Sequence, residues 1–288
     1  MPSLKFYRKR IASVNNTKKI TRAMKLVSAA KLRRAQQAAM DHRDYADRLR
    51  DLLSQIASRV EKVSNPLLQV REGTKTLHVL ITSDRGLCGG FNTNISRKLD
   101  QWVVQNGSQC EKVDIRYVGR KGQDYFRVRK VSASELKGEV LHPLDPTVPE
   151  KLAKELGELY TSGAYDRIYL VYNKFISALS QQVTFDPLFP VATGASKDAG
   201  PAFDFIYEPS RDDLIARLVP AYLSSRVEQA LYESVASEHG ARMTAMDSAT
   251  NNASDMISRL TLYYNRARQA AITKELMEII GGAEALKG

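Results

Sequence analysis

The first 60 residues carry a thin seam of apolar side chains on an otherwise polar segment. Neither glycine nor proline occurs between Ser3 and Arg59, and good helix formers such as alanine, lysine, arginine and leucine dominate. We therefore predict one helix, on the order of 80 Å long at about 1.5 Å per residue. Its apolar positions are Ile11, Val14, Ile20, Met24, Val27, Leu49, Leu52, Leu53, Ile56 and Val60. A seam this narrow is typical of a coiled coil rather than of a helix lying on a globular core.

The C-terminal segment has the same character. After Pro209 and Pro220 no proline follows, and Gly240 is the single glycine before Gly281. We predict a second long helix, with apolar positions at alternating steps of three and four: Met246, Ala249, Ala253, Met256, Leu260, Tyr263 and Ala267. Such a heptad pattern indicates a left-handed coiled coil. The alternative, an amphipathic helix packed on a globular domain, is disfavoured because the rest of the chain is too short to cover both helices.

Between the helices, residues 73–208 alternate between strand and helix patterns. Strands are predicted at 76–83, 112–118 and 167–173, and helices at 92–105, near Gln123 and at 150–162. This alternation favours a mostly parallel sheet with right-handed crossovers. Residues 177–187 (SALSQQVTFDP) and 202–209 (AFDFIYEP) are strand-like and predict an antiparallel edge, whereas 142–149 and 195–201 have the proline and glycine content of loops.

These elements together predict the fold class. A compact domain inserted between two long helices brings their inner ends together, so the helices must run antiparallel. We expect an α/β protein: a long antiparallel coiled coil of the N- and C-terminal helices with an inserted Rossmann-like α/β domain. The predicted domains are an N-terminal coiled-coil helix (1–60), an α/β foot domain (73–208) and a C-terminal coiled-coil helix (209–288).

Basic charge is concentrated at the N-terminus. The first forty residues hold eleven basic side chains and no acidic one, and residues 1–60 hold 15 against four, a surplus equal to the formal net charge of the whole chain, +11. Residues 210–288, with nine basic and ten acidic side chains, neutralise little of it. Lys18, Arg22 and Lys25 share one helical face, where like charges repel by about 0.2–0.5 kcal/mol per pair. The pattern therefore predicts an acidic partner: nucleic acid, an anionic membrane or an acidic protein surface.

The residues indicate no active site, metal site or cofactor. The two cysteines, Cys88 and Cys110, are not spaced as a CxxC motif, and the four histidines are scattered. No run of about 18 apolar residues predicts a membrane span, and the N-terminus lacks the apolar stretch of a signal peptide. We expect a soluble or peripheral protein.

A glycine-rich segment, TSDRGLCGGFN at residues 82–92, follows the first predicted strand and precedes a helix. It matches neither GxxxxGK[ST] nor GxGxxG, so a tight turn with close packing at Gly86, Gly89 and Gly90 is favoured over a nucleotide site. Cys88 at a helix start is a candidate for a thiol of lowered pKa. A small packed cysteine is the favoured interpretation, since no histidine is near it in sequence.

Four blocks, in this order, resemble the gamma subunit of F-type ATP synthases: TKKITRAMKLVSAAKLRRA, SDRGLCGGFN, ARMTAMDSATNNASDMI and YNRARQAAITKELMEIIGGAEAL. The resemblance covers the whole chain. It implies a central rotor shaft without catalytic activity or cofactor, which couples proton flow to ATP synthesis or hydrolysis at the beta subunits. The implied partners are the alpha and beta subunits, the epsilon subunit and the membrane-embedded c-subunit ring. It implies a location at the membrane periphery, and the lack of an inserted cysteine-containing segment or transit peptide favours the cytoplasmic face of a bacterial inner membrane.

The resemblance also implies roles for single residues. Met24, Lys25 and Arg242 match positions near acidic loops of the beta subunits. Deeper in the ring, hydrogen bonds to those subunits are implied for Arg268, Gln269, Thr273 and Glu275. Ile279 and Ile280 would lie in an apolar bearing, and the turn with Gly86, Cys88, Gly89 and Gly90 would belong to the foot.

Two other classes of protein remain as alternatives. A basic helix that follows phosphates would make the chain a nucleic-acid-binding protein, but in basic-zipper proteins the basic segment and the heptads share one helix, whereas here they lie at opposite ends. A flavodoxin-like enzyme decorated with helices would bind nucleotide or flavin through residues 73–208.

Overall fold

A computed structural model of the chain describes residues 3–57, 65–129, 133–136, 138–143, 145–191, 208 and 210–285. It divides into two compact units, Met1–Val27 with Met243–Gly288, and Ser28–Arg242. In chain order the elements are α1 (Leu4–Ala57), η1 (Pro66–Leu68), β1 (Lys75–Ile81), α2 (Phe91–Asn106), η2 (Gly107–Gln109), β2 (Lys112–Val118), α3 (Arg120–Arg129), β3 (Ser134–Glu135), α4 (Val148–Thr161), β4 (Arg167–Phe175), β5 (Gln181–Phe189) and α5 (Arg211–Ala285). Among the described helices, none is long and apolar enough to cross a membrane.

The sheet confirms the predicted α/β topology. Its strand order is β3-β2-β1-β4-β5, with β1 parallel to both β2 and β4, and β5 antiparallel to β4 at one edge. The predicted antiparallel edge at residues 177–187 is therefore confirmed in β5, while most of the second strand-like segment, 202–209, and the predicted loop at 195–201 lie outside the described residues. The predicted loop at 142–149 ends earlier, because α4 already begins at Val148 and a proline is tolerated in a first helical turn.

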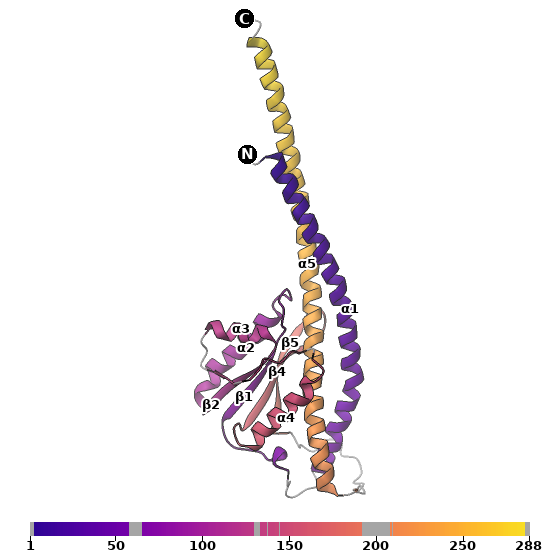
Figure 1. The fold of residues 1–288 in the computed structure, drawn as a ribbon, viewed down its shortest axis with the longest axis vertical. Coiled ribbons are helices and arrows are strands. Elements are labelled where there is room, and N and C mark those ends of the chain that lie inside the picture. The colour runs from indigo at the N-terminus through magenta and orange to yellow at the C-terminus, as the bar shows by residue number, and fades with distance from the viewer. Residues whose placement is uncertain are drawn as a thin grey trace. The chain divides into compact units, whose positions relative to one another are not determined.

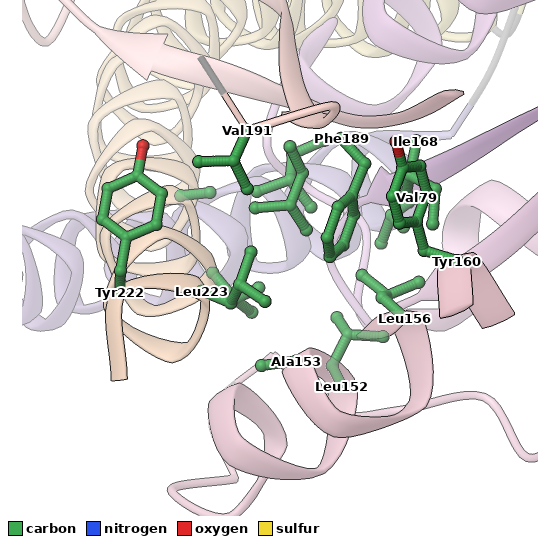
Figure 2. Close-up of a cluster of buried hydrophobic side chains, with 14 of the residues drawn as sticks. Val79, Leu152, Ala153, Leu156, Tyr160, Ile168, Phe189, Val191, Tyr222 and Leu223 are labelled. Carbon is green, nitrogen blue, oxygen red and sulfur yellow. The ribbon is translucent and has the colours of Figure 1, made fainter. Parts of the chain in front are cut away.

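Two apolar cores fill the two faces of the sheet. On one face, α2 and α3 cover the sheet, and on the other face α4 does (Figure 1). In the core between the sheet and α4, side chains of α4 contact the ring of Phe189 from β5, and Leu223 of α5 belongs to the same cluster (Figure 2). Tyr160 stacks on Phe189 with ring centroids 4.4 Å apart. Both rings are fully buried, so this contact ties α4 to the antiparallel edge of the sheet.

The buried face of α1 follows a strict heptad, but its phase differs from the predicted seam. The least exposed positions step alternately by three and four: Leu4, Tyr7, Ile11, Val14, Lys18, Thr21, Lys25, Ser28, Leu32, Ala35, Ala39, His42, Ala46, Leu49, Leu53 and Ile56. Ile20 and Val27, assigned to the seam from their hydrophobicity, are 60% and 56% exposed, and Leu52 is also exposed. The predicted seam was wrong at Ile20 and Val27 because polar side chains occupy the buried face over residues 18–28, and at Leu52 because its neighbour Leu53 takes the buried position. The predicted seam position Val60 lies outside the described residues.

The heptad of α5 is shifted in a similar way. Met246, Ala253, Leu260 and Ala267 lie on the less exposed face as predicted. The alternate positions on this face are Thr250, Ile257 and Tyr264, whereas Met256 and Tyr263 are exposed. The period of the pattern was right, and its phase was wrong by one residue at Met256 and Tyr263, while Ala249, beside Thr250, is half-buried as predicted.

Within the unit formed by residues 1–27 and 243–288, α1 and α5 run antiparallel and polar groups join them. Arg8 donates to the hydroxyl of Tyr264 at 2.8 Å. Closer to the other end of the same unit, the hydroxyls of Thr21 and Thr250 lie 2.8 Å apart, and Lys25 Nζ lies 2.6 Å from Asp247 Oδ1. The residue numbers rise on one helix as they fall on the other, as the antiparallel prediction requires.

Candidate partner-binding surfaces

Lys25 lies at the edge of the seam between α1 and α5. Its ammonium group donates to the carboxylate of Asp247 at 2.6 Å, and the two side chains are 40% and 47% exposed. An ion pair this exposed contributes little to stability, about 0–1 kcal/mol. Lys25 is thus held by an internal carboxylate but remains open to an external one. Its neighbour Met24 is half-buried.

Arg242, in the other unit, makes a different set of contacts. Its side chain is only 11% exposed, and Nη1 donates to Glu238 Oε1 at 2.6 Å. Its other terminal nitrogen, Nη2, lies 3.3 Å from the carbonyl oxygen of Arg85 and 3.2 Å from that of Gly86. Burial raises the pKa of Glu238, and the attraction of Arg242 opposes that rise. The guanidinium group therefore neutralises a buried carboxylate and ties α5 to the glycine-rich turn.

The glycine-rich turn is held by its own side chains. Ser83 Oγ donates to the carbonyl of Arg85 at 2.7 Å, and Asn92 Oδ1 accepts from the Ser83 amide at 3.0 Å. Positive φ angles occur at Leu87 (65°) and Gly89 (57°), not at Gly86 or Gly90. Leu87 in the left-handed region is strained for an L-residue, a detail that the glycine pattern did not reveal.

Cys88, within the same turn, is a packed side chain. It is almost fully buried, and Asn92 Nδ2 lies 3.2 Å from its sulfur. Burial raises the pKa of the Cys88 thiol, the opposite of what a reactive thiolate needs. The structure therefore agrees with the packed cysteine and not with the reactive thiol.

The far part of α5 is exposed on nearly all sides. Arg268, Gln269, Thr273 and Glu275 are all exposed, and none of them is brought against another described element. Five large apolar side chains are exposed beside them: Ile272, Leu276, Met277, Ile279 and Ile280. A helix with so much uncovered apolar surface is marginal in water by itself, which indicates that this segment is a contact surface.

Sequence reasoning missed the buried polar side chains in the middle of α5. Glu233, Ser234, Ser237 and His239 are all buried. No side chain between residues 227 and 240 is exposed, although half of this stretch is polar, so its hydrophobicity pattern carries no signal of this burial.

Comparison with known proteins points to a single protein family along nearly the whole chain. The model of the ATP synthase family matches residues 3–286. The ATP synthase gamma chain of Anaeromyxobacter sp. (strain Fw109-5) is 50% identical over 290 residues, which cover 100% of both chains. In the central stalk and c-ring of the Tetrahymena thermophila mitochondrial ATP synthase, a solved chain is 26% identical, with a TM-score of 0.57 over 80% of this chain and 99% of that chain.

The fold comparison extends further. A chain of the Euglena gracilis mitochondrial ATP synthase, solved with OSCP, F1 and the c-ring, has a TM-score of 0.68 over 98% of this chain and 94% of that chain, at 22% identity. The two chains therefore share one fold over nearly their whole length. The match of the family model and the 50% identity over the full length extend this agreement from fold to family. The chain belongs to the family of ATP synthase gamma chains.

Proposed function

We propose that the chain is the central rotor shaft of a bacterial F-type ATP synthase. In this role it couples proton flow through a membrane-embedded c-subunit ring to ATP synthesis or hydrolysis, and it carries no catalytic site itself. The names of its relatives support the proposal, as do similar chains solved in the rotor or central stalk of ATP synthases. The alternative, a nucleic-acid-binding protein, finds no support in these similarities.

One structural observation carries the proposal. Pairing of Arg8 with Tyr264 places the start of α1 beside Tyr264 of α5, and α5 continues beyond it as a single helix to Ala285. Beyond Tyr264 this single helix exposes five large apolar side chains. A surface of this kind needs a surrounding partner, and a ring of alpha and beta subunits that encloses the tip of the shaft would cover it.

The remaining assignments follow the same role. Residues 1–60 and 209–288 would form the shaft, and residues 73–208 the foot that meets the epsilon subunit and the c-ring at the cytoplasmic face of the inner membrane. The proposed contacts with the beta subunits are Met24, Lys25, Arg242, Arg268, Gln269, Thr273 and Glu275. The turn with Gly86, Cys88, Gly89 and Gly90 would be part of the foot.

The proposed mechanism is one of differential binding. An asymmetric pair of helices presents a different face to each of three identical beta subunits, so rotation changes the conformational equilibrium, and hence the nucleotide affinity, of each in turn. Half-exposed cations such as Lys25 suit this task, because exposed ion pairs are weak and can form and break at every step.

Reconstitution of the catalytic ring tests the role as a whole. The purified chain is expected to have no ATPase activity, and rings of alpha and beta subunits are expected to need it for rapid, cooperative turnover. An equal rate with and without the chain would refute the proposal.

A matched pair of variants tests the site at Lys25. Both Lys25→Glu and Asp247→Ala break the internal ion pair, but only the first removes the cation that an acidic loop would contact. Lys25→Glu should therefore lower ATP-driven proton pumping per ATP hydrolysed, while Asp247→Ala should leave this ratio near the wild-type value. Normal coupling in both variants would show that Lys25 is not a torque contact.

A further inference from the structure

Polar contacts join α5 to the α/β domain along one helical face. Arg226 donates to both carboxylate oxygens of Asp186 in β5 at 2.6 Å. Seven residues further along α5, Glu233 Oε2 accepts from the amide of Phe175, the last residue of β4, at 3.0 Å. These side chains recur at the spacing of one heptad, so they point to the same side of the helix.

The same face continues toward the C-terminus. Ser237 Oγ donates to the carbonyl of Asn173 at 2.8 Å, in a fully buried contact. At Gly240 an added Cβ would lie 3.2 Å from the Cα of Ala178 and 3.3 Å from the ring of Phe175. A glycine inside a helix costs about 1 kcal/mol relative to alanine, and here it permits the β4–β5 turn to approach the helix backbone.

Glu233 is unusual among these contacts because a charge is buried. Its side chain is 6% exposed, and its other oxygen, Oε1, lies 3.7 Å from Arg43 Nη2 of α1. The carboxylate thus links β4, α5 and α1 within one unit. A buried charge is costly and an apolar side chain would often pack there with greater stability, so its benefit lies in fixing one arrangement of the elements.

Arg242 contacts the α/β domain from a second face of α5. Counted around the helix at about 100° per residue, Arg242 lies roughly 180° from Glu233. It nevertheless reaches the carbonyl oxygens of Arg85 and Gly86, which belong to the same α/β domain. The domain therefore holds α5 at two opposite faces, and contacts on opposite faces oppose both sliding along the helix and rolling around it.

We propose that Glu233 and Arg242 are positioning residues that lock the α/β domain on α5, so that turning force applied to the domain reaches the helix without slip. The proposal rests on the proposed function for its consequence, the transmission of force, but the lock itself is a property of the chain alone. The two parts can therefore be tested separately.

The lock is tested by hydrogen exchange in the purified full-length chain. In Glu233→Ala the Phe175 amide loses its acceptor, and loss of a hydrogen bond to a charged group should speed its exchange by roughly 10- to 100-fold. Glu233→Gln keeps an acceptor oxygen and should restore most of the protection. Glu228→Ala is the matched control, because among the described residues Glu228 pairs with His42 and Tyr232 and not with the sheet. Arg242→Met should likewise speed exchange of the amides in residues 83–92.

Force transmission is tested in the complete reconstituted complex. Glu233→Ala should lower ATP-driven proton pumping per ATP hydrolysed at an unchanged yield of assembled complex, and Glu233→Gln should recover the ratio. Arg242→Met is used only in the exchange measurement, because Arg242 is also a proposed contact with the beta subunits. Unchanged exchange at Phe175 in Glu233→Ala would overturn the lock. Faster exchange with a normal pumping ratio would overturn the role in force transmission. If the catalytic ring turned over equally well without the chain, the proposed function would fall while the exchange result still supported the lock.

Discussion

Replacement of His78 by phenylalanine should remove a marked dependence of stability on pH. His78 lies on the central strand β1 and is fully buried among the rings of Trp102, Tyr169 and Phe185. Neither of its ring nitrogens hydrogen-bonds to any residue that the structure describes. Burial in these apolar surroundings lowers the pKa of His78 from 6.5 to about 4.

The sign of the effect follows from proton linkage. Between pH 6.5 and about 4 the unfolded chain binds a proton at His78 and the folded chain does not, so the free energy of unfolding falls as the pH falls. At about 1.4 kcal/mol per unit of pKa, the loss between pH 7.5 and pH 4.5 amounts to about 2.5 kcal/mol. His78→Phe should abolish this part of the loss. At neutral pH it should keep or raise the stability, because two unsatisfied polar atoms leave the core.

Denaturant unfolding of the full-length chain at a series of pH values measures the effect. Trp102 is the single tryptophan, and its ring lies 4.2 Å from that of His78, so its fluorescence reports on this core. Tyr169→Phe is the matched control, because it alters a stacked ring but keeps His78 and its pH slope. His239, whose pKa burial also lowers to about 4, adds a slope that all these proteins share. An identical slope in wild type and His78→Phe would refute the assignment.

Two further substitutions test the packing of the α/β domain by the same denaturant assay. Gly119→Ala should lower the free energy of unfolding by at least about 2 kcal/mol, because φ is +90° and the new Cβ would lie 2.0 Å from the carbonyl oxygen of Thr82. Gly86→Ala is the control: nothing lies within 4 Å of an added Cβ there, so its stability should stay within about 0.5 kcal/mol of wild type. Equal losses in the two variants would contradict the steric argument. Phe189→Ala should cost about 3–5 kcal/mol, since it empties the stack against Tyr160 in a fully buried site, and a loss below 1 kcal/mol would mean that this core is not cooperative with the rest.

The sequence predicted the helices, strands and topology well because their signals are local. Residues 112–118 were predicted to the residue, and the antiparallel edge followed from the β-branched and aromatic side chains near Val183. The phase of the heptads was not accessible in the same way. In α5, apolar side chains stand at both members of the pairs Met256 and Ile257, and Tyr263 and Tyr264, so hydrophobicity alone does not choose between them.

The buried face of α1 could not be predicted from the sequence for another reason. Thr21 and Lys25 are buried or half-buried because Thr250 and Asp247 offer them partners, and that pairing depends on the other helix. The contact of Arg242 with the glycine-rich turn joins residues that are 157 positions apart, which no local pattern reveals. The family resemblance is confirmed, whereas the roles of single residues in partner binding stay predictions.

The pair formed by Lys25 and Asp247 also favours one register of α1 against α5. A slip of the two helices by one heptad would carry Lys25 away from this carboxylate and opposite the hydroxyl of Ser254, seven residues along α5. Each such slip would change the reach of the unpaired end of α5 beyond the start of α1 by about 10 Å, at about 1.5 Å per residue. A weak ion pair that adds little to stability can therefore determine the length of the exposed tip, because it makes one alignment of two nearly uniform helices better than its neighbours.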